Sequence, residues 1–197
     1  EAKRPGYDLV FQGESGLMAL NGEKEQPPLK FGVAVVDLMT GMAAAQAVLA
    51  ALFRRERTGA GRFIEMALYD CGVMITGYYG LDALKLGHDP ERYGNAHPSI
   101  VPYGMYDAAD GPLIITVGTN AQFDKFCRLV LHRPDIVEDE RFANNVSRAK
   151  NRLALSPVLK ELIRSFPRDV LLERLTQAGI PCGKVLGLHD ALTSERT

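Results

Sequence analysis

The longest regular pattern of apolar positions in the sequence follows Asp37. Four small or apolar residues, Val33 to Val36, lead into this acid, and beyond it apolar residues recur at spacings of three and four: Met42, Ala45, Leu49, Leu52 and Phe53. This spacing predicts an amphipathic α-helix with one apolar face. The pattern is followed by cations that suit the negative end of the helix dipole, Arg54, Arg55 and Arg57. Gly59 and Gly61 come next and can supply a left-handed cap.

Two more elements are expected before residue 88. The segment FIEMAL, residues 63–68, alternates bulky apolar and other residues and predicts a β-strand. A second helical pattern runs from about Asp70 to Leu86 and stops at Gly87. Residues 88–104 are rich in Gly, Pro and Asn, which predicts a loop and a domain boundary.

The pattern beyond this loop indicates a smaller α+β unit at about residues 98–185. A β-hairpin is expected with Asp110-Gly111 as its turn and Leu113 to Val117 as the returning strand. Helical patterns follow at about residues 121–131, at 157–166 with Ser156 and Pro157 as cap and first position, and at 169–178 before Gly179.

Composition narrows the class of protein. The chain has 197 residues, of which 46% are hydrophobic and 24% charged, so it can bury a core as a soluble globular protein. The formal net charge of -1 argues against a nucleic-acid binder. Because Asp37 and Gln46 interrupt the best candidate, we expect no apolar run of roughly 20 residues and no membrane span.

The ends of the chain and its cysteines suggest a cytoplasmic protein of which this is a part. The first residues have neither an initiator Met nor the order of a signal peptide, so the chain reads as a piece of something longer. Cys71, Cys127 and Cys182 lack the spacing of metal ligands and are expected to be reduced thiols.

Asp37 has two interpretations from the residues alone. As the N-cap of the long helix it would satisfy one free amide and contribute about 1 kcal/mol. The same position suits a nucleophile, because the positive helix end favours an ionised carboxylate and the flanking apolar residues would limit its access to water. Carboxylates serve as covalent nucleophiles in several enzymes, but one acid before one helix leaves both interpretations open.

A set of motifs along nearly all 197 residues resembles the class III CoA-transferases, the family of formyl-CoA, carnitine and bile-acid CoA-transferases. The motifs are GYD followed by Gln12 and Ser15-Gly16, then PPLKFGVAVVDLMTG, LAALFRRERTGAGRFIEMALYD, RYGNAHPSIVPYGMY, DG, AQFDKFCRLV, DERFANNVSRAKNR and AGIPCG. Members of the family are roughly twice as long, so the chain resembles the middle of one.

The resemblance implies an α/β protein with the family's fold. Residues 1–75 would be the C-terminal part of a Rossmann-like large domain that carries the catalytic Asp, and residues 76–97 a helical linker and loop. Residues 98–185 would form the small α+β domain, and residues 186–197 the start of a linker back to the large domain. Relatives form interlocked homodimers in which two chains thread through each other, which places the active site near the dimer interface. This chain alone is expected to be inactive because much of the CoA-binding surface would be absent.

The resemblance also implies chemistry. The acid of the family's D-x-x-T-G segment is the nucleophile, and Asp37 with Thr40 and Gly41 matches it. Asp37 would attack an acyl-CoA thioester to give a mixed anhydride and then an aspartyl-CoA thioester, from which CoA passes to a free carboxylic acid. No metal and no separate cofactor would be needed, and the run around Asn95 is most similar to relatives that act on small acids such as succinate.

Further contacts to CoA or substrate are implied for six residues. Tyr7 matches a family tyrosine beside the CoA region, with Asp8 and Gln12 nearby; an interfacial aromatic is the alternative for Tyr7. The segment of Gly94, Asn95 and His97 matches in position a glycine-containing loop that covers the active site in relatives. The formyl-CoA transferase loop is richer in glycine, so loop motion is not carried over, and His97 has a structural hydrogen bond as its alternative role.

Two other functions are weighed against CoA transfer. The α-methylacyl-CoA racemases resemble the chain and keep an Asp at the Asp37 position, but they carry a His at Tyr7 and a Glu near Asn120, groups suited to moving an α-proton. Their absence favours transfer. A non-catalytic, helix-rich interaction module is also compatible with the neutral composition.

Overall fold

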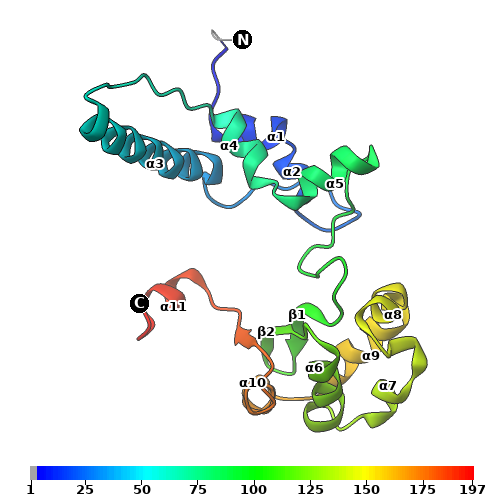
Figure 1. Cartoon of the computed structure of the whole chain (residues 1–197). Helices are drawn as coiled ribbons and strands as arrows, with labels where there is room; N and C mark the ends of the chain where they lie inside the picture. The colour runs from blue at the N-terminus through cyan, green and yellow to red at the C-terminus, as the bar shows by residue number, and fades with distance from the viewer. Residues whose placement is uncertain (1–3) are drawn as a thin grey trace. The chain divides into compact units, whose positions relative to one another are not determined.

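The computed structural model of the protein describes residues 4–197 and divides into two compact units (Figure 1). The first unit ends at Gly94 and the second runs from Asn95 to Thr197, so the division falls inside the loop expected at residues 88–104. The finer division into segments 1–75, 76–97, 98–185 and 186–197 stays a prediction.

The described residues of the first unit contain helices and no strand. The helices are α1 (Asp8–Glu14), α2 (Leu17–Leu20), α3 (Val35–Thr58), α4 (Leu68–Ile75) and α5 (Tyr78–Leu86). Helix α3 packs against α4 and α1, and α1 also contacts α2 (Figure 1). Since no sheet is present among residues 4–94, assignment of this unit to a Rossmann-like domain also stays a prediction.

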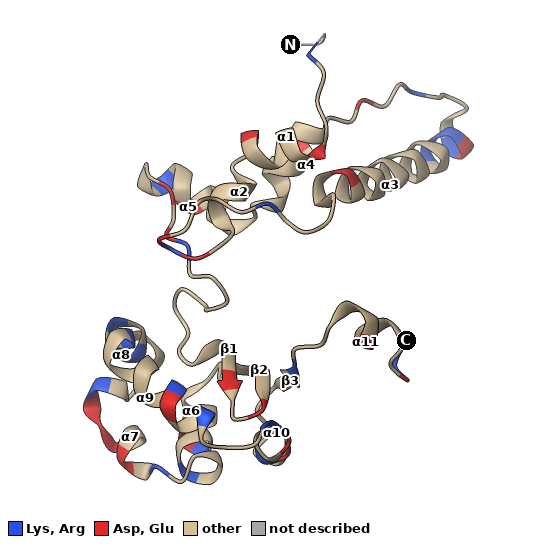
Figure 2. Ribbon diagram, turned by 180° about the vertical axis from the view of Figure 1, so that it is seen from behind, with Lys and Arg blue, Asp and Glu red and all other residues tan. Residues whose placement is uncertain are grey.

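The long helix after the apolar run is confirmed as α3. It ends at Thr58 and is capped by Gly59, which adopts a left-handed φ of 70° and donates its amide to the carbonyl of Arg55. Figure 2 shows an acidic residue near its start and basic residues at its end, the order that complements a helix dipole.

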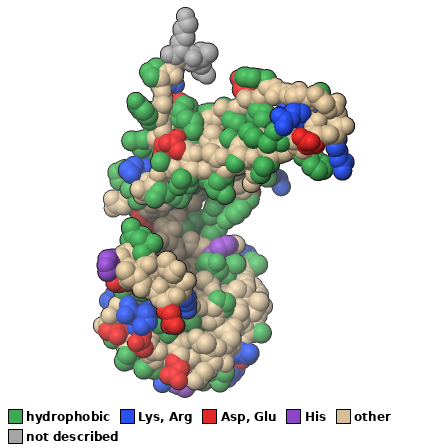
Figure 3. Space-filling model, turned by 90° about the vertical axis from the view of Figure 1, so that its left-hand side faces the viewer, with side chains coloured by type: hydrophobic (Ala, Val, Ile, Leu, Met, Phe, Trp, Pro, Cys, Tyr) green, Lys and Arg blue, Asp and Glu red, His purple; other side chains and the backbone are tan. Residues whose placement is uncertain are grey.

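The expected apolar face of α3 is exposed. Leu49 and Phe53 are 66% and 62% exposed, and Val36 is the buried residue of this helix. Hydrophobic side chains are spread over the first unit, the upper part of Figure 3.

By length and composition alone α3 could also cross a membrane, because it has 24 residues and a mean hydropathy of 1.7 in its most apolar window. The expectation that no apolar run is long enough to cross a bilayer was therefore wrong by this test of length and composition. That the protein has no membrane partner stays a prediction.

The strand expected at residues 63–68 was wrong. Residues 61–67 form neither helix nor strand, and Phe63 is 87% exposed. A strand needs a neighbouring strand for its backbone hydrogen bonds, and the described chain supplies none here.

The helix expected from Asp70 to Leu86 is two helices, because Gly77 has a φ of 57° and a ψ of -134° and divides α4 from α5. Its predicted end at Gly87 is confirmed by a left-handed φ of 74°.

The second unit contains a three-stranded antiparallel sheet of β1 (Tyr103–Ala108), β2 (Gly111–Thr116) and β3 (Cys182–Lys184), in that order. The predicted hairpin is confirmed, but its turn lies one residue earlier: Ala108 pairs with Gly111, so Ala109 and Asp110 form the loop. Helices cover the sheet (Figure 1). The helices and helical turns of the unit are α6 (Asn120–Lys125), a π-helical turn (Phe126–Val130), α7 (Pro134–Glu138), a 3-10 turn (Glu140–Phe142), α8 (Asn145–Lys150), α9 (Arg152–Arg164), α10 (Arg168–Gln177) and α11 (Leu188–Leu192). Of these, α9 contacts β1, and α10 contacts β2 and β3.

Two of the three predicted helices in this unit lie where they were expected. The first is α6 with its π-helical continuation, capped by Thr119 and Gln122, and the second is α10, which is followed by left-handed Gly179. The third begins at Arg152 rather than at Pro157, so Pro157 lies inside α9. Leu155, Leu159 and Ile163 are fully buried on one face of α9, and this burial outweighs the hydrogen bond that the proline removes.

Most of the buried apolar residues belong to the second unit. Alternate residues of β2 and the residue after it, Leu113, Ile115 and Val117, are fully buried and pack with α9, α10 and the π-helical turn. The three cysteines are free thiols, as expected. Burial raises the pKa of the Cys127 thiol to about 12, which makes it a poor nucleophile.

Candidate active site

Asp37 lies in the first turn of α3 as its third residue, and its side chain is exposed. It is not the N-cap, a position that Ala34 occupies without a side-chain hydrogen bond. The expectation that apolar neighbours shield Asp37 from water was also wrong for this chain, because Val33 and Leu38 are each 60% exposed. Among the described residues the Asp37 carboxylate is therefore open to solvent.

The helix cap comes from Asp8, far away in the sequence. Its Oδ1 accepts hydrogen bonds from the amides of Val36 at 2.8 Å and Asp37 at 3.2 Å, across 28 and 29 residues. Asp8 is buried, so its carboxylate satisfies two of the amides that a helix leaves free at its start. One of these two amides belongs to the candidate nucleophile, which fixes the backbone that carries it.

Gln12 holds Asp8 in place. Its amide nitrogen donates to Asp8 Oδ2 at 2.5 Å and to the carbonyl of Val33 at 3.3 Å, and its oxygen accepts from the amide of Phe31 at 2.9 Å. Gln12 is 1% exposed. Asp8 and Gln12 were predicted to contact CoA or substrate, and the structure places them as the buried support of the segment that leads into α3.

Tyr7 lies directly before α1 and is 83% exposed. Its carbonyl accepts from the amides of Val10 and Phe11 at the start of that helix. Thr40, from the D-x-x-T-G segment, donates its hydroxyl to the carbonyl of Val36 at 2.7 Å. The structure thus brings Asp8, Gln12 and the backbone of Asp37 together. Tyr7, the residue before Asp8 in the sequence, is exposed to solvent.

The predicted loop residues lie on either side of the division between the units. Gly94 ends the first unit with a left-handed φ of 54° and donates its amide to the carbonyl of Gly22 at 3.2 Å. Asn95 and His97 begin the second unit, where the side-chain Nδ2 of Asn95 lies 3.9 Å from the sulfur of Met105. His97 accepts backbone hydrogen bonds through its ring, so its alternative structural role is present in the structure.

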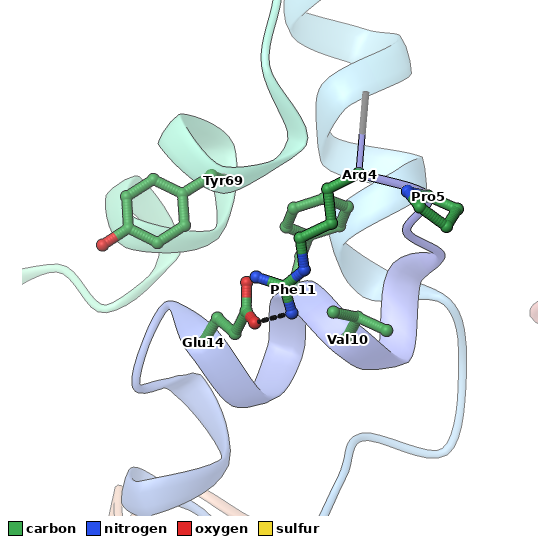
Figure 4. A pocket seen from close by; sticks show the side chains of 6 residues that line it. All are labelled: Arg4, Pro5, Val10, Phe11, Glu14 and Tyr69. Atoms are coloured by element: carbon green, nitrogen blue, oxygen red, sulfur yellow. Dashed lines mark hydrogen bonds and ion pairs between the residues drawn. The ribbon is translucent and has the colours of Figure 1, made fainter. Parts of the chain in front are cut away.

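A pocket of about 350 Å³ is lined by α1, α4 and the residues before α1, and no pattern in the sequence predicted it. Figure 4 shows its lining: Arg4, Pro5, Val10, Phe11, Glu14 and Tyr69. Arg4 forms an ion pair with Glu14 there. Tyr69 comes from α4, so the pocket depends on a long-range contact that local spacing does not reveal.

Among residues 4–197 no group of three or more His, Cys, Asp or Glu side chains has the arrangement of a metal site.

The support of α3 by Asp8 leads to a first prediction. Asp8→Ala in the whole protein leaves two helix amides and the Gln12 amide without this acceptor, so we expect a loss of about 1 to 2 kcal/mol in the free energy of unfolding. Activity should fall by about 10- to 100-fold because the backbone of Asp37 is no longer held. Urea unfolding and steady-state kinetics measure the two effects.

Glu14→Ala is the matched control, because Glu14 is an exposed acid on the same helix. It should leave both quantities nearly unchanged. Equal effects of the two substitutions would show that the Asp8 cap contributes nothing specific.

Comparison with known proteins defines the class. The family model described as CoA-transferase family III matches residues 1–197. The chain therefore belongs to this family. It is 37% identical over 186 residues to the succinate–glutarate CoA-transferase of Agrobacterium fabrum, with 94% of this chain and 46% of the relative covered. It is 35% identical over 193 residues to the succinyl-CoA:glutarate CoA-transferase of Mus musculus, with 96% and 43% covered.

The fold comparison agrees. The structure matches the crystal structure of a CAIB/BAIF family protein from Brucella suis with a TM-score of 0.85 and 40% sequence identity, covering 99% of this chain and 51% of the other. The mixed α/β architecture is therefore that of the class III CoA-transferases. The chain spans about half the length of the relatives it matches.

Proposed function

We propose that the protein containing this chain transfers CoA from an acyl-CoA thioester to a free carboxylic acid, with Asp37 as the nucleophile. The observation that carries the proposal is the Asp37 carboxylate, exposed in the first turn of α3 while the buried Asp8 carboxylate holds its backbone amide. Family membership along the whole chain supports it.

The proposed reaction needs no oxidant and no net proton. A carboxylate oxygen of Asp37 attacks the thioester carbon, the carbon–sulfur bond breaks, and a mixed anhydride and CoA thiolate result. The thiolate attacks the aspartyl carbonyl of the anhydride, which releases the donor acid and leaves an aspartyl-CoA thioester. The acceptor carboxylate attacks this thioester, and the released thiolate then attacks the acceptor's acyl carbon, so that acyl-CoA leaves and the Asp37 carboxylate is restored. Every intermediate is an anhydride or a thioester, so an activated acyl bond is kept until CoA reaches the acceptor acid.

Two positions favour transfer over racemisation. Tyr7 stands where the related racemases carry His, and its phenol lacks the imidazole that removes an α-proton at neutral pH. Asn120 stands near their Glu, and its Oδ1 accepts a hydrogen bond from Arg148 at 3.0 Å. An amide that is fixed in this way supplies no acid or base to a substrate.

The relatives support a proposed substrate class. Both relatives named above carry glutarate and a succinyl or succinate group in their names, so small dicarboxylic acids are the proposed acids. The interlocked homodimer remains a proposal that rests on the resemblance, and the cytoplasmic location remains one that rests on the scattered cysteines.

A paired assay tests this function. With succinyl-CoA and a series of free dicarboxylic acids, we expect the whole protein to form a new acyl-CoA whose rate depends on the acceptor acid. With an α-deuterated 2-methylacyl-CoA and no acceptor, we expect no loss of deuterium. Rapid loss of deuterium without transfer would assign the racemase function, and neither activity would favour a non-catalytic module.

A further inference from the structure

The last residues of the first unit lie against a loop that is distant in the sequence, residues 21–30. Arg92 donates from Nε to the carbonyl of Glu23 at 3.1 Å and from Nη2 to the carbonyl of Lys24 at 3.3 Å. Its Nη2 also donates to the carbonyl of Gln26. One guanidinium thus satisfies three carbonyls of a single turn, and its charge strengthens each of these hydrogen bonds.

Two further contacts join the same two segments. The amide of Gly94 donates to the carbonyl of Gly22 at 3.2 Å. Because Gly94 has a left-handed φ and lies against the carboxylate of Glu23, a larger residue there would be strained and would displace that side chain. The ion pair of Lys24 with Glu91 lies on the surface, where such a pair contributes little. The arginine is therefore the main connection.

The loop that Arg92 binds is closed on itself. The amide of Leu29 donates to the carbonyl of Asn21 at 3.3 Å. Nδ2 of Asn21 donates to the carbonyl of Lys30, also at 3.3 Å. The two ends of the loop are therefore tied together, and residues 21–30 are expected to move as one piece.

Hydrogen bonds continue from the end of this loop to the first turn of α3. The amide of Phe31 donates to Gln12 at 2.9 Å, and Gln12 donates to the carbonyl of Val33 at 3.3 Å. The amide of Asp37 donates to Asp8 at 3.2 Å. A displacement of the loop would therefore act on the backbone that carries the candidate nucleophile.

We propose that Arg92 is a positioning residue for CoA transfer: it holds residues 21–30, and through them the segment that enters α3 and carries Asp37. The inference rests on the proposed function, because the reaction at Asp37 is what the arginine affects. Since its guanidinium donates to backbone carbonyls, Arg92 acts through the chain and not on a substrate.

Hydrogen exchange of the whole protein tests the structural part of this inference. In the wild-type protein the amides of Leu29 and Gly94 should be protected. In Arg92→Gln we expect the backbone of residues 21–37 to exchange about 10-fold faster, because hydrogen bonds from a charged group are lost. Arg92→Lys keeps the charge without the fork of donors and should restore part of the protection. Unprotected amides in the wild-type protein, or unchanged exchange in Arg92→Gln, would overturn the proposal.

Steady-state kinetics with succinyl-CoA and a free dicarboxylic acid test the role in the reaction. In Arg92→Gln we expect kcat to fall by about 10-fold while both KM values stay within about twofold, because the nucleophile is displaced and no substrate contact is removed. Arg92→Lys should recover part of kcat. A raised KM at unchanged kcat, or a wild-type kcat together with faster exchange, would contradict the proposed role.

Asn21→Ala tests whether the effect passes through the loop. It removes the hydrogen bond to the carbonyl of Lys30, so it should also lower kcat, and it should lower it less in the Arg92→Gln background than alone. Full additivity would show that Arg92 acts by another route. Arg62→Gln is the matched control, because Arg62 is an exposed arginine of the same unit that forms no hydrogen bond or ion pair with the described residues. If it has the same effect as Arg92→Gln, the proposal is wrong.

Labelling of Asp37 by acyl-CoA and hydroxylamine separates this inference from the proposed function. If the wild-type protein is labelled and Arg92→Gln is labelled at the same rate, the role of Arg92 is wrong and the function stands. If the wild-type protein is not labelled at Asp37, the function itself is wrong.

Discussion

Asp37→Asn is expected to reduce CoA transfer by the whole protein by about 1,000-fold or more, because it removes the nucleophile and not merely a charge near the site. The amide has nearly the same shape as the carboxylate. Since the Asp37 side chain is exposed and Asp8 binds its backbone amide, the fold of α3 should be retained. Initial rates of acyl-CoA formation measure the loss, and circular dichroism checks the fold.

Asp70→Asn is the matched control for this experiment. Asp70 is also an exposed acid in the first turn of a helix of the first unit, α4. It should keep activity close to that of the wild-type protein. If Asp37→Asn retains comparable activity, Asp37 is not the nucleophile, however similar the chain is to its relatives.

Arg148→Met is expected to have the largest effect on stability, about 3 kcal/mol or more in the free energy of unfolding. Arg148 is fully buried and donates to the carbonyls of Val101 and Phe142 and to the side chains of Asn120 and Asn145, at 2.7 to 3.0 Å. Its guanidinium lies 4.2 Å from the centre of the Phe123 ring. Burial lowers the pKa of this guanidinium from its ordinary value.

The reason for this large effect is that methionine fills much of the arginine's volume but donates nothing. Several buried acceptors are then left without a partner, and each such group costs about 1 to 3 kcal/mol. Urea unfolding of the whole protein measures the change. Arg128→Met is the control, because Arg128 forms ion pairs only at the surface, with Asp124 and Glu138. If the two substitutions have equal effects, the buried network is not a major source of stability.

The parts of the fold that follow from local sequence were predictable. The helix α3 combines apolar periodicity with a cap at Gly59, and the hairpin of β1 and β2 combines alternation with a short turn. Prediction failed where a distant contact decides the structure. Pro157 would end an isolated helix, but the buried face of α9 keeps it helical. The segment at Phe63 has the composition of a strand, and no neighbouring strand is present among the described residues.

The candidate site shows the same division. Asp37 could be identified from its motif, because the resemblance to the family includes the residues around it. Its cap could not, since Asp8 reaches it across 29 residues and no local spacing links the two. Arg148 and Arg152 likewise act on carbonyls far from them in the sequence, and an arginine on a helix ordinarily suggests a solvated surface.

The central claim is that an Asp37 oxygen becomes covalently bonded to the acyl group and that the Asp37 carbonyl then carries CoA. The most direct measurement is to incubate the whole protein with succinyl-CoA and hydroxylamine and to map the modified peptides by mass spectrometry. We expect one hydroxamate, on Asp37, formed only when the acyl-CoA is present. A hydroxamate found only on other residues, or none at all in a protein that transfers CoA, would contradict the account.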